Sequence, residues 1–61
     1  MTRGQAWRLL DLGRRLGEPS VIATALEGLA RLAAAAGDRA TATAQVAEAA
    51  DVRERFHRPA P

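Results

Sequence analysis

The 61-residue chain has no cysteine, no tyrosine and only two aromatic residues, Trp7 and Phe56. Without cysteine it can form neither a disulfide nor a thiolate metal site, the two commonest covalent aids to the folding of so short a chain. The scarcity of aromatic side chains argues against a small β-fold and against a ligand pocket, because both depend on aromatic anchors. We therefore expect helix packing to hold the chain together.

Bulky apolar residues, lysine and long hydrophobic runs are also scarce or absent. Alanine supplies fifteen of the twenty-nine hydrophobic residues, so the core must be thin. The longest apolar run, 32–36, is far shorter than the ~20 residues that span a bilayer, and residues 1–4 do not lead into a signal peptide, so we expect a cytoplasmic protein without a membrane partner. Nine arginines face seven acidic residues, and the net charge of +2 is too small to indicate nucleic-acid binding.

Glycine and proline divide the chain, which is short enough to be a single domain, into three segments with helical periodicity. The breaks are Gly17-Glu18-Pro19 and Gly37-Asp38. The sequence predicts an all-α fold of three antiparallel helices, at about 4–16, 19–36 and 39–56, followed by a tail at 57–61. The second and third helices are expected to form a hairpin that the N-terminal helix flanks.

Local signals mark the ends of these helices. Thr2 and Gln5 have the spacing of a capping box at the start of the first helix. Gly17 is expected to end this helix in the left-handed conformation, and Asp38 to cap the start of the third. Gly13 weakens the first helix by about 1 kcal/mol relative to alanine, so we interpret it as the site of a close helix crossing.

Apolar residues recur at helical spacing and predict the buried face of each helix. The predicted face of the first helix is Ala6, Leu9, Leu10, Gly13 and Leu16. That of the second is Ile22, Ala25, Leu26, Leu29, Leu32, Ala33 and Ala36, and that of the third is Ala42, Val46, Ala49, Val52 and Phe56. Acidic residues also stand four positions before arginine, which predicts the ion pairs Asp11–Arg15, Glu27–Arg31, Asp51–Arg55 and Glu54–Arg58.

The sequence contains no catalytic constellation. Ser20 and His57 are the only serine and histidine, and they belong to different helices with no acid placed to orient the histidine. We interpret His57 as a last-turn residue that suits a helix C-terminus. One histidine cannot form a metal site, and the glycines lack the spacing of a phosphate loop. We therefore expect no enzyme activity, no cofactor, no metal and no small-molecule substrate.

The two glycine–acid turns bracket the second helix and indicate a helical repeat. The run Ala-Leu-Glu-Gly-Leu-Ala at 25–30, followed by Ala33, Gly37-Asp38, Ala42, Val46 and Ala49, resembles one tetratricopeptide repeat. Residues 9–19 resemble the second helix of a preceding repeat, which makes one and a half repeats over residues 5–57. The phrases at 25–30 and at 53–55 before Pro59 are similar to the C-terminal repeats of large bacterial transcription regulators with an ATPase module, of the LuxR-type and antibiotic-regulatory families.

This resemblance implies a module for protein–protein interaction or self-association. The face of such a repeat that contacts partners maps to Thr24, Glu27, Arg31 and Ala35. Trp7 lies off the apolar stripe of the first helix and is a further candidate contact, the alternative being that its ring folds over the neighbouring helix. Because repeat proteins generally need about three repeats, one and a half should leave an apolar flank open, and we expect a protein partner or a homo-oligomer.

A helix-turn-helix DNA-binding module is the alternative function. The third helix displays Arg39, Thr41, Thr43 and Gln45 in its first turns, where side chains can read bases. A two-residue turn and long flanking helices instead favour an antiparallel hairpin over the ~90–120° crossing of that motif. The sequence leaves open whether the chain is an independent protein or a piece of a larger regulator, and which partner it binds.

Overall fold

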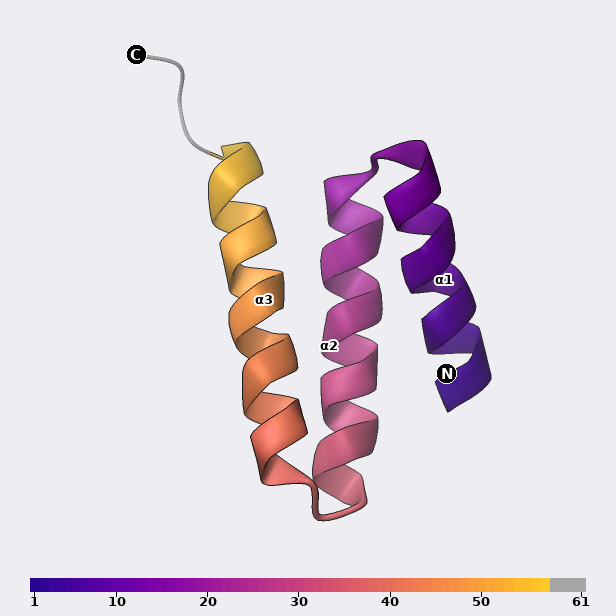
Figure 1. Cartoon of the computed structure of the whole chain (residues 1–61), viewed down its shortest axis with the longest axis vertical. Coiled ribbons are helices and arrows are strands. Elements are labelled where there is room, and N and C mark those ends of the chain that lie inside the picture. The colour runs from indigo at the N-terminus through magenta and orange to yellow at the C-terminus, as the bar shows by residue number, and fades with distance from the viewer. Residues whose placement is uncertain (58–61) are drawn as a thin grey trace.

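The computed structural model describes residues 1–57, with side chains through Phe56, and these residues form three α-helices. They are α1 (Arg3–Leu16), α2 (Pro19–Ala35) and α3 (Arg39–His57), each antiparallel to the next (Figure 1). The predicted all-α fold, a helical hairpin with a flanking N-terminal helix, is confirmed. α2 ends one residue earlier than the sequence predicts, and α3 includes His57, which the sequence predicts to lie in the tail. The interpretation of the His57 side chain and the rest of the tail lie outside the described residues.

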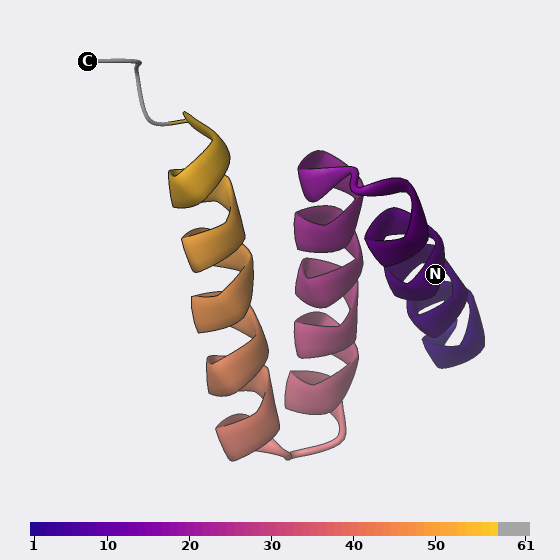
Figure 2. The ribbon, with the colours of Figure 1, turned by 45° about the horizontal axis from the view of Figure 1, so that its top comes forward.

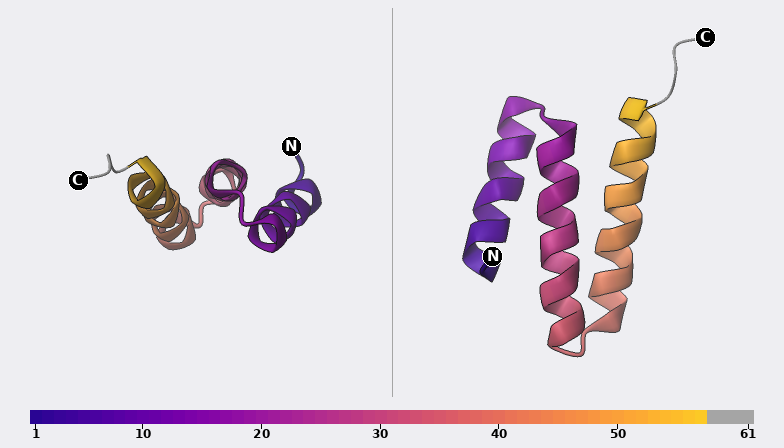
Figure 3. Two further views of the ribbon diagram at one scale, coloured as in Figure 1. Left: turned by 90° about the horizontal axis from the view of Figure 1, so that it is seen from above. Right: turned by 180° about the vertical axis from the view of Figure 1, so that it is seen from behind.

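The helices form one bent layer with α2 in the middle. α2 packs against both neighbours, whereas the backbones of α1 and α3 do not come into contact. Seen from above, α1 and α3 flank α2 and are both displaced to the same side of it, so the layer curves (Figure 3). The tilted view shows the same order, with α2 between the other two helices (Figure 2). The core therefore lies along α2.

Hydrogen bonds at the helix ends follow the local sequence signals. Gln5 N–H donates to Thr2 Oγ1 at 3.2 Å and Thr2 N–H donates to Gln5 Oε1 at 2.9 Å, which confirms the capping box. Gly17 has a φ of 64° and ends α1, as predicted, and Glu18 N–H donates to the Gly13 carbonyl at 2.9 Å. Left-handed φ is the conformation in which glycine avoids the penalty of a Cβ.

The turn between α2 and α3 repeats this scheme. Gly37 has a φ of 84°, and the N–H of Asp38 donates to the Ala33 carbonyl at 2.8 Å. Asp38 Oδ1 accepts the N–H of Thr41 at 3.1 Å, which confirms Asp38 as the cap of α3. Hydrogen bonds from the Thr41 hydroxyl and N–H hold the pKa of the Asp38 carboxyl below its ordinary value. The connection spans residues 36–38, one residue more than the predicted turn.

Gly13 lies at a close crossing of α1 and α2, as the sequence indicated. It is buried, and a Cβ at this position would lie 3.0 Å from Ile22 Cγ1 and from Val21 Cγ1, and 3.1 Å from the Ile22 nitrogen. The space for a side chain is therefore taken by the first turn of α2.

The predicted buried faces are correct near α2 and wrong at the outer edges. The confirmed members are Ala6, Leu10, Gly13, Ala25, Leu26, Leu29, Ala33 and Ala49, with Leu9, Ile22, Leu32 and Val52 partly buried against them. Leu16, Val46 and Phe56 are instead 63%, 54% and 65% exposed, and Ala36 is exposed too. Leu16 and Phe56 are exposed because α1 and α3 each pack against one neighbour, so only a narrow strip of either helix is covered. Val46 lines a hollow between α2 and α3 and is exposed there. Ala23 and Ala30, outside the predicted stripe, are buried because α2 has helices on two sides.

Candidate protein-interaction surfaces

Three of the predicted contact residues meet on the exposed side of α2. Thr24, Glu27 and Arg31 line a shallow hollow of about 250 Å³ that Met1, Gly28 and Leu32 complete. Thr24 and Arg31 are exposed, and Glu27 is half-buried. Ala35, the fourth residue of the set, is exposed at the end of α2 and does not line this hollow.

Glu27 is held by an ion pair that the sequence did not indicate. Arg53 of α3 donates from Nη2 to Glu27 Oε1 at 2.9 Å and from Nη1 to Glu27 Oε2, so the contact is bidentate. This hydrogen bonding lowers the pKa of the Glu27 carboxyl and raises the pKa of Arg53. The predicted Glu27–Arg31 pair is therefore wrong, because the planar guanidinium of Arg53 offers two parallel hydrogen bonds across the hairpin.

Two of the other predicted ion pairs are confirmed. Arg15 Nε lies 3.1 Å from Asp11 Oδ2, and Arg55 Nη2 lies 2.9 Å from Asp51 Oδ2. The Glu54–Arg58 pair lies outside the described residues. With Glu27 engaged by Arg53, Arg31 forms no ion pair within the part of the chain that the structure describes, and its guanidinium is available to a partner.

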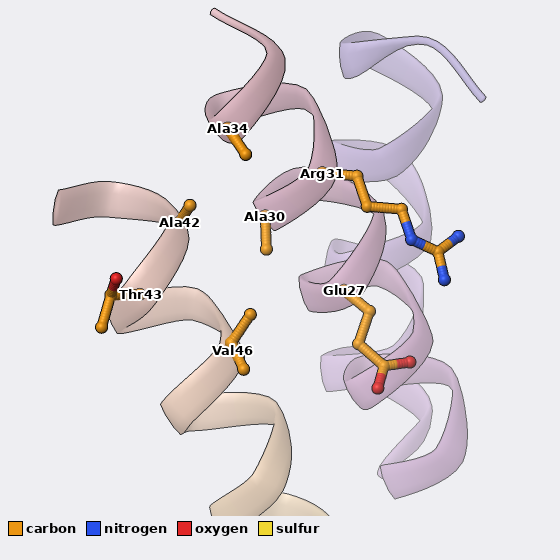
Figure 4. A pocket seen from close by; sticks show the side chains of 7 residues that line it. All are labelled: Glu27, Ala30, Arg31, Ala34, Ala42, Thr43 and Val46. Atoms are coloured by element: carbon orange, nitrogen blue, oxygen red, sulfur yellow. The ribbon is translucent and has the colours of Figure 1, made fainter. Parts of the chain in front are cut away.

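A second hollow separates α2 from α3 on this side of the layer. It has a volume of about 490 Å³ and is lined by Glu27, Ala30, Arg31, Ala34, Ala42, Thr43 and Val46 (Figure 4). Figure 4 shows Val46 directed toward α2, where the methyl groups of Ala30 and Ala34 lie across the hollow from Ala42 of α3. The small alanine side chains leave this seam open, and most of Val46 stays in contact with solvent.

The third hollow, which we call the three-helix groove, runs over α2 between α1 and α3. Its walls and floor are Arg3, Trp7, Leu29, Ala33, Ala36, Asp38, Thr41 and Gln45, and its volume is about 270 Å³. Trp7 is 51% exposed, so its ring covers part of the groove without being enclosed by it. Gln45 Oε1 is buried and has no hydrogen-bond partner among the described residues.

An ion pair joins the two outer helices across α2. Arg14 Nη2 of α1 lies 3.8 Å from Glu48 Oε1 of α3, and both side chains are more than half exposed. Arg14, Glu48 and Arg53 were not among the predicted contact residues, because each is brought to its partner by the packing of helices far apart in the sequence. Trp7 lines a different hollow from Thr24, Glu27 and Arg31, so the predicted contacts do not form one surface.

The described residues were also compared with the requirements of a metal site and of a membrane span. Residues 1–57 contain no group of three histidine, cysteine or acidic side chains that could hold a metal ion. None of the helices in this range combines the length and apolar character needed to cross a membrane. Comparison with protein-family models, with curated proteins and with solved structures gave no match.

Proposed function

We propose that this chain is a non-enzymatic module for protein–protein interaction or self-association, of the tetratricopeptide-repeat type. One observation carries the proposal: more large apolar side chains are exposed than buried. Among the described residues the exposed ones are Met1, Trp7, Leu12, Leu16, Val46 and Phe56, and the buried ones are Leu10, Leu26 and Leu29. Association with another protein is one way in which such apolar side chains are removed from water.

The arrangement of the helices explains where these side chains lie. Leu12 and Leu16 belong to α1, and Val46 and Phe56 belong to α3, and the backbone of each of these helices packs against α2 alone. In a helical repeat array every inner helix is covered on two sides, and the end helices present the surface onto which the next element docks. The exposed residues of α1 and α3 therefore suit contact with further protein.

The repeat-like features of the chain support the tetratricopeptide type. Gly17-Glu18 and Gly37-Asp38 form the same glycine-ended helix terminus, and Gly13 allows α1 to approach α2 closely. Within this proposal the chain offers two contact surfaces. One carries the exposed Thr24, Arg31 and Ala35 of α2, where Glu27 braces the hairpin, and the other is the three-helix groove that Trp7 lines. The similarity to bacterial transcription regulators adds the proposal that such a module serves a regulator in the cytoplasm.

Sedimentation equilibrium of the purified chain over a tenfold concentration range tests the proposal. We expect an apparent mass that rises with concentration above the 6.5 kDa of one chain. A chain that is fully helical and monomeric throughout, with a thermal midpoint above ~65 °C, would refute it, because it would show that the exposed apolar surface needs no cover.

DNA binding through α3 receives less support from the geometry. Thr43 lines the hollow between α2 and α3, whereas Thr41 and Gln45 line the three-helix groove, so these side chains do not share one reading face. Retention on DNA at two salt concentrations distinguishes the functions, because phosphate contacts give a steep salt dependence.

A further inference from the structure

The two rims of the three-helix groove carry opposite charges. The α1 rim presents Arg3 and Arg14, and the opposite rim presents Asp38 and Glu48. Of the other ion pairs made by α1 and α3, Asp11–Arg15 and Asp51–Arg55 lie within one helix, and the pair of Arg53 with Glu27 lies on the other face of α2. The groove is therefore bordered by a basic edge and an acidic edge.

The opposite charges of the two rims also lie at the same positions along the helix axes. Arg14 lies opposite Glu48, to which it is paired at 3.8 Å, and Arg3 lies opposite Asp38 at the other end of the groove. Because α1 and α3 are both antiparallel to α2, they run in the same direction (Figure 1). A basic residue on one edge thus has an acidic residue at the same level on the other.

Such a face is complementary to itself under one two-fold rotation. A two-fold axis parallel to the helices places α1 of one copy over α3 of the other, so that Arg3 meets Asp38 and Arg14 meets Glu48 of the second copy. A two-fold axis perpendicular to the helices in the plane of the face would place α1 over α1, with arginine against arginine. Isologous interfaces need this self-complementarity, and like charges across an interface oppose binding.

The face is also large enough for a stable dimer. At ~1.5 Å per residue, α2 is about 26 Å long, and three axes ~8–10 Å apart with their side chains give a width of about 30 Å. The outline of this face, roughly 700–800 Å², is the upper limit of the area that each copy can bury, and it is close to the ~800 Å² per partner of a standard interface. Trp7, half exposed within it, is the residue type that most often anchors such contacts.

We propose that the chain forms a two-fold dimer through the three-helix groove, with the helices of both copies parallel to the axis and α1 of each copy over α3 of the other. This inference rests on the proposed function, of which it specifies the partner, a second copy. Trp7 of each copy lies against Thr41 and Gln45 of the other, and the paired rims select this orientation.

Charge reversal at Arg14 and Glu48 tests the dimer. In Arg14→Glu both symmetric contacts become acid against acid, and in Glu48→Arg both become arginine against arginine, so each variant alone should dimerise at least about tenfold more weakly. An equimolar mixture of the two variants should regain the wild-type dimer constant within about threefold, because both contacts are complementary in the mixed dimer. The intramolecular Arg14–Glu48 pair stays broken in each chain of that mixture, so only an intermolecular contact explains the rescue.

The controls separate this inference from the proposed function. Arg8→Glu makes the same change in net charge on α1 at an exposed residue that, unlike Arg14, forms no ion pair with the described residues of α3, and it should leave the dimer constant unchanged. Circular dichroism confirms that each variant is helical. A wild-type dimer that both reversals leave intact, or that the mixture does not restore, overturns the groove interface but not self-association. A wild-type monomer at every concentration overturns the inference and the self-association on which it rests.

Discussion

At the scale of single residues, Gln45 has a buried amide oxygen that accepts no hydrogen bond from residues 1–57. We predict that Gln45→Met stabilises the chain by about 1 kcal/mol, because an apolar side chain of similar shape removes the desolvated acceptor. Gln5→Met is the matched control and should be destabilising, since Gln5 Oε1 accepts the Thr2 N–H in the capping box. Urea denaturation at one protein concentration measures both. Equal effects of the two substitutions would contradict the prediction.

The glycines of α1 and α2 differ in the room that they leave for a side chain. We predict that Gly13→Ala destabilises the chain by about 1–2 kcal/mol, because the new methyl group meets the backbone of Ile22 and forces the helices apart. Gly28→Ala should be neutral or stabilising, since its Cβ would meet only the sulfur and Cε of Met1, at the end of a flexible side chain. Gly4→Ala, with nothing within 4 Å, reports the gain in helix propensity alone. Thermal melts of the three variants give the order.

At the scale of the elements, the Glu27–Arg53 ion pair ties α2 to α3 and makes the hairpin sensitive to acid. Hydrogen bonds from Arg53 hold the pKa of Glu27 below its ordinary value of 4.5. A carboxyl with a lowered pKa in the folded state stabilises that state above pH 4.5, and this stabilisation is lost as the pH falls through the lowered value. Asp38, whose carboxylate accepts hydrogen bonds from Thr41, likewise stabilises the folded state above pH 3.8, and this contribution is lost as the pH falls through its lowered pKa.

We predict that Glu27→Gln is less stable than the wild type at neutral pH and that the difference shrinks as the pH falls below about 4.5. Thermal melts between pH ~7 and pH ~3, followed by circular dichroism, measure this difference. Asp51→Asn changes the net charge equally and removes an ion pair confined to α3, so it corrects for charge alone. A difference between Glu27→Gln and the wild type that is independent of pH would contradict the assigned role.

How far the sequence predicts this fold depends on the range over which each signal acts. The capping box of Thr2, the left-handed Gly17 and the cap at Asp38 are local, and the structure confirms all three. The two-sided burial of α2 was missed, because periodicity gives one stripe per helix and does not say how many neighbours a helix has. The Glu27–Arg53 contact joins residues 26 positions apart and depends on the register of the hairpin, which no local spacing encodes.

The candidate surfaces were predicted less completely than the fold for the same reason. Thr24, Glu27 and Arg31 share a face because they are spaced along one helix, so a pattern within α2 suffices to group them. The three-helix groove is built from three helices, and the opposition of Arg14 to Glu48 appears only when α1 and α3 are placed on the same side of α2. A surface built from several helices can be predicted only when the packing of those helices is known.

At the scale of the whole molecule, α1 and α3 are coupled energetically almost entirely through their contacts with α2. Their backbones do not come into contact, and their side chains are joined by the exposed Arg14–Glu48 pair, a class of contact that contributes ~0–1 kcal/mol. Stability in such a linear arrangement is a sum over neighbouring interfaces, and each outer helix can open without the other. The backbone amides of the three helices should therefore differ in their protection from hydrogen exchange, and those of α2 should be the best protected.

Native-state hydrogen exchange of two core variants tests this independence. Leu10 is buried at the α1 side of the core and Val52 is partly buried on α3. Leu10→Ala costs ~2–5 kcal/mol at its site, so amides of α1 should exchange at least about thirtyfold faster, while those of α3 change by less than about threefold. Val52→Ala should show the reverse, with faster exchange in α3 and little change in α1. If either substitution accelerates both outer helices equally, the three helices open as one cooperative unit, and the coupling between α1 and α3 is stronger than their contacts with α2 alone can provide.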